Sequence, residues 1–261
     1  MDKLRKSIQI FKSIFKDPRV LNRLLEDNDY WHERILKQNK DYAPFPIISL
    51  HDLDKDFLQT INPYSFLDGG SLITDLALLK VLARAKKEST FFEIGTWRGE
   101  SVANLSEDCS ECFTMDLPDQ EKQALGMTQE YIAQHAILSK QLKNVTHIKA
   151  NSFHFDFSSL QRKFDLIFID GDHHYKSIVN DTKLVFKHLV HDDTVVVWHD
   201  YAYYPGKVRN EVFAAIADSV ESTKHQHLYY VKNTLSAVYL PKGILKSNVS
   251  ERQFEVTIRF V

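Results

Sequence analysis

The stretch that decides the fold is Phe91-Phe92-Glu93-Ile94-Gly95-Thr96-Trp97-Arg98-Gly99-Glu100-Ser101. Its apolar start predicts a strand, and the two glycines predict a sharp turn into a helix that begins close to a ligand. The spacing Glu-x-Gly-x-x-x-Gly differs from the Gly-x-Gly-x-x-Gly motif, which aims a helix N-terminus at a pyrophosphate. Trp97 and Arg98 stand where a phosphate loop would carry small residues. The loop therefore favours a nucleotide-sized ligand without a pyrophosphate, although a tight strand-to-helix connection without a ligand would show the same pattern.

Polar residues also end the next two predicted strands. The strand over residues 112–116 ends at Asp116, about twenty residues after the first glycine, where a carboxylate can accept both hydroxyls of a ribose. The third strand covers residues 145–150 and ends at Asn151 and Ser152, whose polar groups suit an adenine edge.

Two further predicted strands end in the same way. The fourth, over residues 164–169, ends at Asp170, and the fifth, over residues 194–198, ends at His199 and Asp200. In an open parallel sheet the ligand crevice lies beyond the carboxyl ends of the strands. We therefore expect the polar strand ends to converge in space.

Composition fits one enzyme-sized domain with an extension. The chain has 261 residues, 43% of them hydrophobic, and a net charge of -2, which argues against a general nucleic-acid binder. No run approaches the roughly 18 apolar residues of a membrane span, and the N-terminus lacks the apolar core of a secretory signal. The expected location is cytoplasmic.

The chain divides into three predicted parts: a helical N-terminal extension over residues 1–68, an α/β domain over residues 69–242, and a tail over residues 243–261 with an extra edge strand. Apolar residues of the extension recur at helical spacing. Its first half carries Lys3, Arg5, Lys6, Lys12, Lys16 and Arg19. Peripheral contact with an anionic membrane or an acidic partner is one interpretation. The other is a solvated face on a helix that packs against the domain or a second subunit of a homo-oligomer.

Three other features have both a structural and a functional interpretation. Cys109 and Cys112 have the Cys-x-x-Cys spacing of zinc and redox sites, but the further zinc ligands are missing and a redox pair would open a helix. We therefore expect a turn whose Cys112 enters the core as a small hydrophobe. The long segment 117–144 is either a lid at the ligand edge or an outer helix with a long lead-in. The tyrosines after strand five either stack on an acceptor or pack in a half-buried loop. These are Tyr201, Tyr203 and Tyr204.

The chain resembles the class I S-adenosylmethionine-dependent methyltransferases, and within them the small-molecule O-methyltransferase-like branch. The first loop matches Glu-Ile-Gly-x-x-x-Gly-x-Ser, and residues 168–175, Phe-Ile-Asp-Gly-Asp-His-His-Tyr, are similar to the second signature of that branch. The resemblance covers roughly residues 70–240. It implies an α/β fold with a Rossmann-like, doubly wound, seven-stranded mixed sheet and helices on both faces. The chain departs from the pattern at residues 191–193, where His-Asp-Asp replaces a Pro-Gly-Gly turn.

The resemblance implies S-adenosylmethionine as cofactor and a small-molecule acceptor beside strands four and five. The predicted cofactor contacts are Glu93, Gly95, Thr96, Gly99, Ser101, Asp116, Asn151, Ser152 and Asp170. The predicted catalytic residues are His173, as the general base that takes the acceptor proton, and Asp170. The adjacent His174 is an alternative base, and a structural histidine is the alternative for both.

A divalent metal at Asp170, His199 and Asp200 is a further prediction. Adjacent parallel strands place their ends about 5 Å apart, so side chains at both ends can share one ion. The mixed oxygen and nitrogen ligands suit Mn, Fe or Zn at least as well as Mg. In the competing interpretation Asp170 caps the following turn, and the other two residues hydrogen-bond the backbone or the acceptor without a metal.

Three functions follow from these patterns. The first is O-methylation of a hydroxyl on a sugar or a secondary metabolite. The second is a nicotinamide-dependent oxidoreductase, which the missing third glycine and Trp97 disfavour. The third is a non-catalytic adapter that keeps the cofactor-binding fold. The acceptor is not identified by the sequence, because a fold does not determine its substrate.

Overall fold

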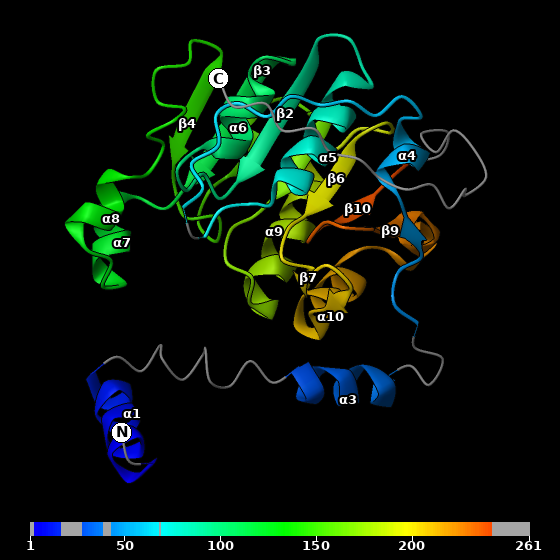
Figure 1. Ribbon diagram of the computed structural model, residues 1–261. Coiled ribbons are helices and arrows are strands. Elements are labelled where there is room, and N and C mark those ends of the chain that lie inside the picture. Colours follow the sequence, from blue (N-terminus) through cyan, green and yellow to red (C-terminus); the bar gives the residue numbers. More distant parts are fainter. Residues whose placement is uncertain (1–2, 17–27, 39–42, 68, 242–261) are drawn as a thin grey trace. The chain divides into compact units, whose positions relative to one another are not determined.

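The computed structural model describes residues 3–16, 28–38, 43–67 and 69–241. The chain divides into two units, Met1–Tyr42 and Ala43–Val261. In its described residues, the first unit contains the helices α1 (Lys3–Lys16) and α3 (Asn28–Gln38), which lie within the predicted N-terminal extension (Figure 1). Residues 17–27 of the predicted extension, including Arg19, and the predicted tail at residues 243–261, with its edge strand, lie outside the described residues.

The second unit is built on one sheet whose strand order is β1-β9-β10-β6-β5-β2-β3-β4. Its strands are β1 (Ile47–Ile48), β2 (Ser89–Ile94), β3 (Cys109–Asp116), β4 (Val145–Lys149), β5 (Leu166–Ile169), β6 (Val195–Trp198), β9 (Leu228–Val231) and β10 (Ala237–Tyr239). Strands β6, β5, β2, β3 and β4 are parallel, and β10 runs antiparallel to both of its neighbours. This is the predicted doubly wound α/β fold with a mixed sheet.

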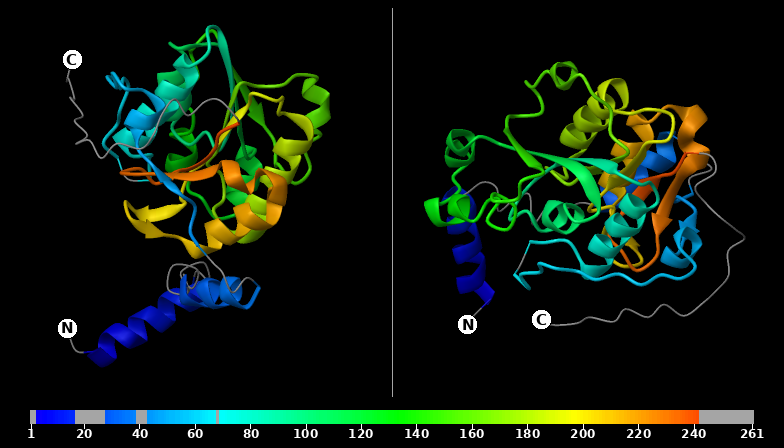
Figure 2. Two further views of the ribbon diagram at one scale, coloured as in Figure 1. Left: turned by 90° about the vertical axis from the view of Figure 1, so that its right-hand side faces the viewer. Right: turned by 90° about the horizontal axis from the view of Figure 1, so that it is seen from above.

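Helices cover both faces of the sheet, with α5 and α6 on one face and α9 and α10 on the other (Figures 1 and 2). The helices of this unit are α4 (Leu50–Leu53), α5 (Ile73–Arg84), α6 (Glu100–Leu105), α7 (Asp119–Ala124), α8 (Gln129–Ala133), α9 (Tyr175–His188) and α10 (Asn210–Ser219). Two short 3-10 helices, Phe157–Leu160 and Ser222–His227, and a hairpin of β7 (Ala202–Tyr204) and β8 (Lys207–Val208) complete it. Because both faces are covered, every residue of β5 and β6 is buried. No helix in the described ranges is long and apolar enough to cross a membrane.

The prediction of seven strands is wrong, because the main sheet has eight. The additional strand, β1, pairs in parallel with β9 at one edge of the sheet. Only two residues long, it follows Pro46 and shows no alternating pattern, so the sequence indicated an irregular connection there. Its pairing uses the carbonyl oxygens of Pro46 and Ile48, which accept the N–H groups of Tyr230 and Lys232. A proline carbonyl can still accept a ladder bond, although its nitrogen cannot donate one.

Residues 43–67 fall in the second unit, although the sequence placed them in the N-terminal extension. Besides the β1 pairing, the N–H of Asn62 donates to Asn104 at 2.7 Å and that of Ser65 donates to Glu100 at 2.6 Å. Both acceptors lie on α6, directly after the glycine loop. The segment therefore helps to hold the helix that begins at Gly99.

Both cysteines lie in β3 as free, buried thiols, with Cys109 6% and Cys112 0% exposed. Their neighbours in the core are apolar side chains of the sheet and of α5 and α6. Cys112 thus has the role of a small core hydrophobe that the sequence predicts, whereas Cys109 lies in the strand and not in the predicted turn.

Gly95 makes the closest approach between two strand ends. Its φ is 103°, and a β carbon at this position would lie 1.9 Å from the carbonyl oxygen of Asp170 and 2.9 Å from the nitrogen of Gly171. The Asp170 N–H also donates to Ile94 O at 2.8 Å. The turn after β2 thus packs directly on the turn after β5. The space beside Gly95 is filled by the backbone of Asp170 and Gly171, so the fold requires a residue without a side chain at this position.

We predict that Gly95→Ala destabilises the fold by more than about 3 kcal/mol, because the backbone of Asp170 cannot move without breaking the β2–β5 pairing. Gly206→Ala is the matched control. Gly206 also has a positive φ, 94°, but an added β carbon would meet nothing within 4 Å. That control should cost only about 1 kcal/mol of strain. Urea unfolding of both variants measures the difference, and equal costs would contradict the proposed steric role of Gly95.

Candidate active site

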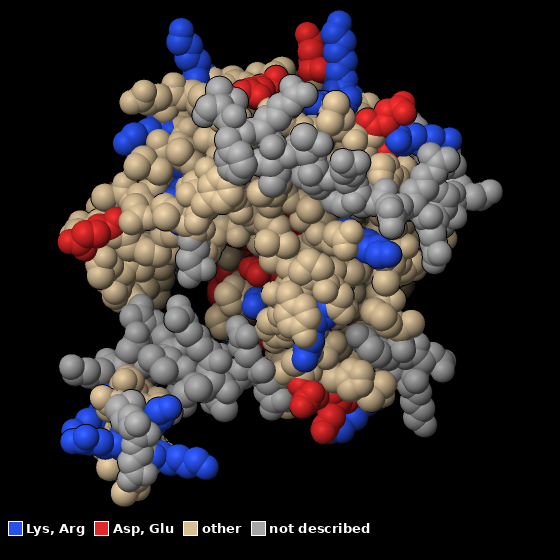
Figure 3. All heavy atoms as spheres, in the orientation of Figure 1, with Lys and Arg blue, Asp and Glu red and all other residues tan. Residues whose placement is uncertain are grey.

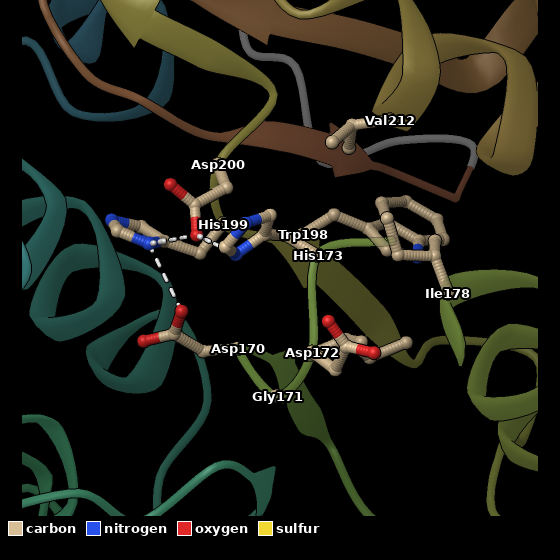
Figure 4. A pocket seen from close by; sticks show the side chains of 10 residues that line it. Asp170, Gly171, Asp172, His173, Ile178, Trp198, His199, Asp200 and Val212 are labelled. Atoms are coloured by element: carbon tan, nitrogen blue, oxygen red, sulfur yellow. Dashed lines mark ion pairs between the residues drawn. The ribbon is translucent and has the colours of Figure 1, made fainter. Parts of the chain in front are cut away.

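Three polar side chains gather where β5 and β6 end (Figure 4). Asp170 follows β5, and His199 and Asp200 follow β6, so the parallel pairing of these strands places them together. His199 Nδ1 lies 3.0 Å from Asp170 Oδ1 and 3.7 Å from Asp200 Oδ2. We call these three residues the strand-tip cluster. It contains the residues that the sequence predicts as metal ligands.

A third acid, Asp75 of α5, lies behind His199. Its side chain is 0% exposed, and its Oδ2 is 3.5 Å from His199 Nε2. Asp75 accepts hydrogen bonds from the N–H groups of Leu72 and Leu235 and from the hydroxyl of Ser236. These bonds fix the carboxylate, which in turn orients the imidazole of His199.

The charges of the strand-tip cluster depend on one another. Burial alone would lower the pKa of His199, but the charge and hydrogen bond of Asp170, with the nearby carboxylates of Asp200 and Asp75, raise it well above its usual value. Burial raises the pKa of Asp170, against the attraction of His199. Burial would also raise the pKa of Asp200, yet the hydrogen bond and charge of His199 hold it well below the usual range. At neutral pH the cluster therefore holds an imidazolium beside an ionised Asp200.

His173 lies at the rim of the cluster. Its Nδ1 is 3.7 Å from Asp200 Oδ2, and 42% of its side chain is exposed. Its ring stacks on that of His174, with centroids 5.2 Å apart, but His174 forms an ion pair with Asp172. Of the two adjacent histidines, His173 is thus the one that faces the strand-tip cluster.

The pocket beside the cluster has an apolar wall formed by Ile178, Trp198 and Val212 (Figure 4). Asp200, at its edge, has a φ of 57°, a left-handed conformation that few residues other than glycine adopt. Such backbone strain is common where a side chain must be aimed at a functional site. The pocket therefore combines an apolar wall with polar groups that converge at one end, which is typical of small-molecule sites.

The three tyrosines after β6 have different surroundings. Tyr201 is 0% exposed and stacks on Phe45 with centroids 5.3 Å apart, so it belongs to the core. Tyr204 is 60% exposed. The guanidinium of Arg209 lies 4.6 Å from the ring centroid of Tyr203 and 3.8 Å from Asp200 Oδ1. Tyr203 is the tyrosine that this cation connects to the strand-tip cluster.

Glu93, Thr96 and Ser101 form a buried polar network under the glycine loop. Glu93 is 0% exposed and accepts hydrogen bonds from the hydroxyls of Ser101 and Thr114. The Thr114 hydroxyl lies 2.6 Å from that of Thr96. Burial raises the pKa of Glu93 to about 8, although the bonds from Ser101 and Thr114 oppose the shift. These three predicted cofactor residues thus support the loop from beneath.

Asp116 ends β3 with a carboxylate that is already partly engaged. Lys122 of α7 lies 2.6 Å from its Oδ2, the Leu117 N–H donates to its Oδ1 at 2.8 Å, and His135 Nε2 lies 3.5 Å away. Lys122 is 2% exposed, so its ammonium depends on this partner. The Asp116 side chain remains 21% exposed and can be reached by a ligand.

The predicted adenine contacts also have protein partners. Asn151 donates to Glu121 of α7 at 2.7 Å and accepts the N–H of Phe153 at 3.0 Å. Ser152 lies beside Asp181. Burial raises the pKa of Asp181, and the hydrogen bond with Ser152 opposes this shift only in part. Helix α7 therefore contacts the ends of both β3 and β4.

The long segment 117–144 packs on the glycine loop. The ring of Tyr131 in α8 lies 4.1 Å from that of Trp97, measured between centroids. A β carbon on Gly99, whose φ is 81°, would lie 2.2 Å from the hydroxyl oxygen of Ser139. Gly99 is thus small because this segment approaches it. The segment covers the loop, as a lid at the ligand edge would.

The strand-tip cluster fits a divalent cation by its donor chemistry. One ligand atom from each of its three residues lies within 4.8 Å of the others. The Nε2 of His199 makes no hydrogen bond among the described residues and faces the fixed carboxylate of Asp75. A metal-binding imidazole commonly has such a carboxylate behind it.

Residues 92–201 match the family model described as a methyltransferase domain. This range contains the second half of β2, the glycine loop, Asp116 and the strand-tip cluster. Residues 92–201 are a methyltransferase domain. The predicted resemblance to the class I methyltransferases is confirmed for this part of the chain.

The chain is 30% identical over 131 residues to an uncharacterized protein of Acanthamoeba polyphaga mimivirus, over 46% of this chain and 54% of that protein. The chain thus spans about half the length of the curated relative that it matches. It is also similar to the O-methyltransferase from Bacillus cereus in complex with SAH, at 14% identity and a TM-score of 0.46, over 66% of this chain and 82% of that chain. A second similar structure is the O-methyltransferase TomG from Streptomyces achromogenes in complex with SAM, at 16% identity and a TM-score of 0.45. The similarity covers 67% of this chain and 82% of that chain.

Sequence reasoning missed several residues that contact the methyltransferase domain's site. Asp75 lies in α5, before the matched range, and nothing in its helical pattern distinguishes it from a surface acid. Lys122 lies in a polar stretch, DQEKQA, that indicates an exposed helix. Tyr131 lies in the predicted lid, and the sequence alone does not show which part of the fold its ring contacts. The lysine spaced six residues after Asp116 is the one signal that could have been noticed.

We predict that Glu93 makes the stability of the methyltransferase domain fall as the pH rises. Its pKa is about 8 in the fold and lies lower in the unfolded chain, so folding retains a proton between these values. Between these two pKa values Glu93 is ionised only in the unfolded state, so the free energy of unfolding should fall by up to about 1.4 kcal/mol per pH unit. Above the folded pKa it should level off. Below the unfolded pKa the effect disappears.

Glu93→Gln is the matched variant, because it keeps the size of the side chain and cannot ionise. Urea unfolding of both proteins from about pH 5 to about pH 9 gives the difference in unfolding free energy, in which all other titrating groups cancel. The difference should grow in favour of the variant up to about pH 8. Parallel curves would show that Glu93 is ionised throughout.

Proposed function

We propose that this protein is an S-adenosylmethionine-dependent methyltransferase that O-methylates a hydroxyl of a small molecule, such as a sugar or a secondary metabolite. The observation that carries the proposal lies within the methyltransferase domain. There the strand-tip cluster and His173 converge beside an apolar pocket wall, at the end of the sheet that also presents Asp116. The resemblance of residues 168–175 to the second signature of the O-methyltransferase-like branch supports the choice of oxygen as acceptor.

The residues present fit S-adenosylmethionine, which supplies a methyl group on a cationic sulfonium when it is bound. Asp116 has a fixed, partly exposed carboxylate that can accept ribose hydroxyls in addition to its bond from Lys122. Asp75 and the two acids of the strand-tip cluster, three carboxyl groups, outnumber the imidazolium of His199 and the guanidinium of Arg209, which lies 3.8 Å from Asp200 Oδ1. This excess of negative charge in a buried place favours a cationic ligand.

We assign to His173 the role of the general base that takes the proton from the acceptor hydroxyl, because of its position and exposure. Its side chain is 42% exposed, and its Nδ1 lies 3.7 Å from Asp200 Oδ2, which is beyond hydrogen-bond distance. His199 is a poor base, because its raised pKa keeps it protonated at neutral pH. Asp200 is then placed to stabilise the imidazolium that forms on His173, as an acid does beside a catalytic histidine. The apolar wall would hold the acceptor and exclude water.

A divalent metal at Asp170, His199 and Asp200 is part of the proposal. Supported by Asp75, His199 would supply a nitrogen ligand and the two acids would supply oxygen ligands. A bound Mn, Fe, Zn or Mg ion would favour the deprotonated form of an acceptor hydroxyl. Loss of the proton from His199 must accompany binding, so affinity should rise with pH.

Two other functions remain as outcomes of the test. An oxidoreductase would bind a nicotinamide cofactor, but the glycine loop carries Trp97, whose ring stacks on Tyr131 over the loop. A non-catalytic adapter would bind S-adenosylmethionine without turnover.

The experiment is transfer of a labelled methyl group from S-adenosylmethionine to a fraction of small hydroxylated metabolites. We expect label in the small-molecule fraction and a loss of about 100-fold or more in His173→Ala, the scale of general base catalysis. His174→Ala is the matched variant, and we expect it to keep most of the activity. A chelated sample, with each cation then restored, tests the metal. Cofactor binding without label would favour the adapter, and full activity after chelation would exclude the metal.

A further inference from the structure

Helix α1 (Lys3–Lys16) has one continuous apolar face. Leu4, Ile8, Phe11 and Phe15 recur at intervals of three and four residues, which places them on the same side of the helix. Their exposed fractions are 68%, 48%, 64% and 87%. Two phenylalanines so open to water are unfavourable unless something covers them.

All the charged residues of α1 are basic. Lys3, Arg5, Lys6 and Lys12 lie on it, and the helix sequence KLRKSIQIFKSIFK contains no acidic residue. Arg5 and Lys12 are seven residues apart and therefore lie on one side, next to the apolar face. Figure 3 shows the helix at the lower left with blue side chains around it and no red ones.

The distribution of charge decides between the partners that such a face can have. Two copies that paired along the apolar face would bring their basic flanks together, with no acid on the helix to compensate them. An anionic bilayer supplies both an apolar layer and the opposite charge. With 14 residues the helix is about 21 Å long, too short to cross a hydrocarbon core of about 30 Å, so it must lie in the plane of the surface.

We propose that α1 attaches this protein to the surface of an anionic membrane, with Phe11 and Phe15 inserted among the lipid chains and the basic residues among the headgroups. This proposal does not rest on the proposed methyl transfer, because α1 belongs to a different unit from the strand-tip cluster. One amphipathic helix gives reversible attachment. The acceptor of the enzyme would then be met at or near a membrane.

The test is flotation of the full-length chain with vesicles of phosphatidylcholine alone and of phosphatidylcholine with phosphatidylserine. We expect flotation with the anionic vesicles and a loss of binding at high salt, because exposed charges are then screened. Phe11→Ser with Phe15→Ser should abolish flotation by removing the apolar contact. Arg5→Glu with Lys12→Glu should weaken binding by more than about tenfold, since each basic residue near the surface contributes about a fivefold factor.

The matched controls are Leu58→Ser and Lys55→Glu, both at exposed positions of the second unit, and we expect them to float like the wild type. Equal flotation with both kinds of vesicle would overturn the electrostatic part of the proposal. Absence of the wild type from anionic vesicles, or unchanged flotation of the double phenylalanine variant, would overturn it entirely. So would a dimer, detected by light scattering, that the same double variant dissociates, because a second copy would then cover the face.

Discussion

The contact between Gly95 and the backbone of Asp170 is the constraint on which the site depends. With no side chain at position 95, the turn after β2 can lie against the turn after β5 at a distance that no other residue permits. The register of the central strands then follows from the parallel pairing of β2 with β3 and β5. That register places Asp116 on one side of the glycine loop and Asp170 on the other. The chemistry of the site is thus a consequence of how closely two turns pack.

The site region has several buried acids, and the structure compensates their charges in three ways. Glu93 has a pKa raised to about 8 by burial, so it is mostly protonated at neutral pH. Asp116 is paired with the buried ammonium of Lys122, and Asp75 receives backbone and hydroxyl hydrogen bonds. Asp200 is held ionised by His199. Acids treated in such different ways at one end of a sheet are typical of functional sites, where pKa values are moved apart.

Much of the fold could be predicted because strand ends and glycines are local signals. The order of the central strands and the meeting of Asp170 with His199 follow from the pattern of apolar runs that end in polar residues. The two-residue strand β1 could not be predicted, because it forms by pairing with a strand almost two hundred residues away and has no periodicity of its own. Asp75 could not be predicted for a related reason. Its role comes from contacts with Leu235 and Ser236, which only the folded chain brings near.

We propose that Asp116 holds the ribose of S-adenosylmethionine at this end of the sheet, and calorimetric titration of the cofactor is the most direct test of this role. Asp116→Asn keeps the shape of the side chain but removes its charge, and should weaken S-adenosylmethionine binding by about 10-fold to 150-fold, equivalent to about 1.5–3 kcal/mol. Lys122→Met, which keeps the carboxylate, should bind with little change, and NADH should not bind the wild type. Unchanged affinity in a folded Asp116→Asn variant, or tight binding of NADH, would contradict the account.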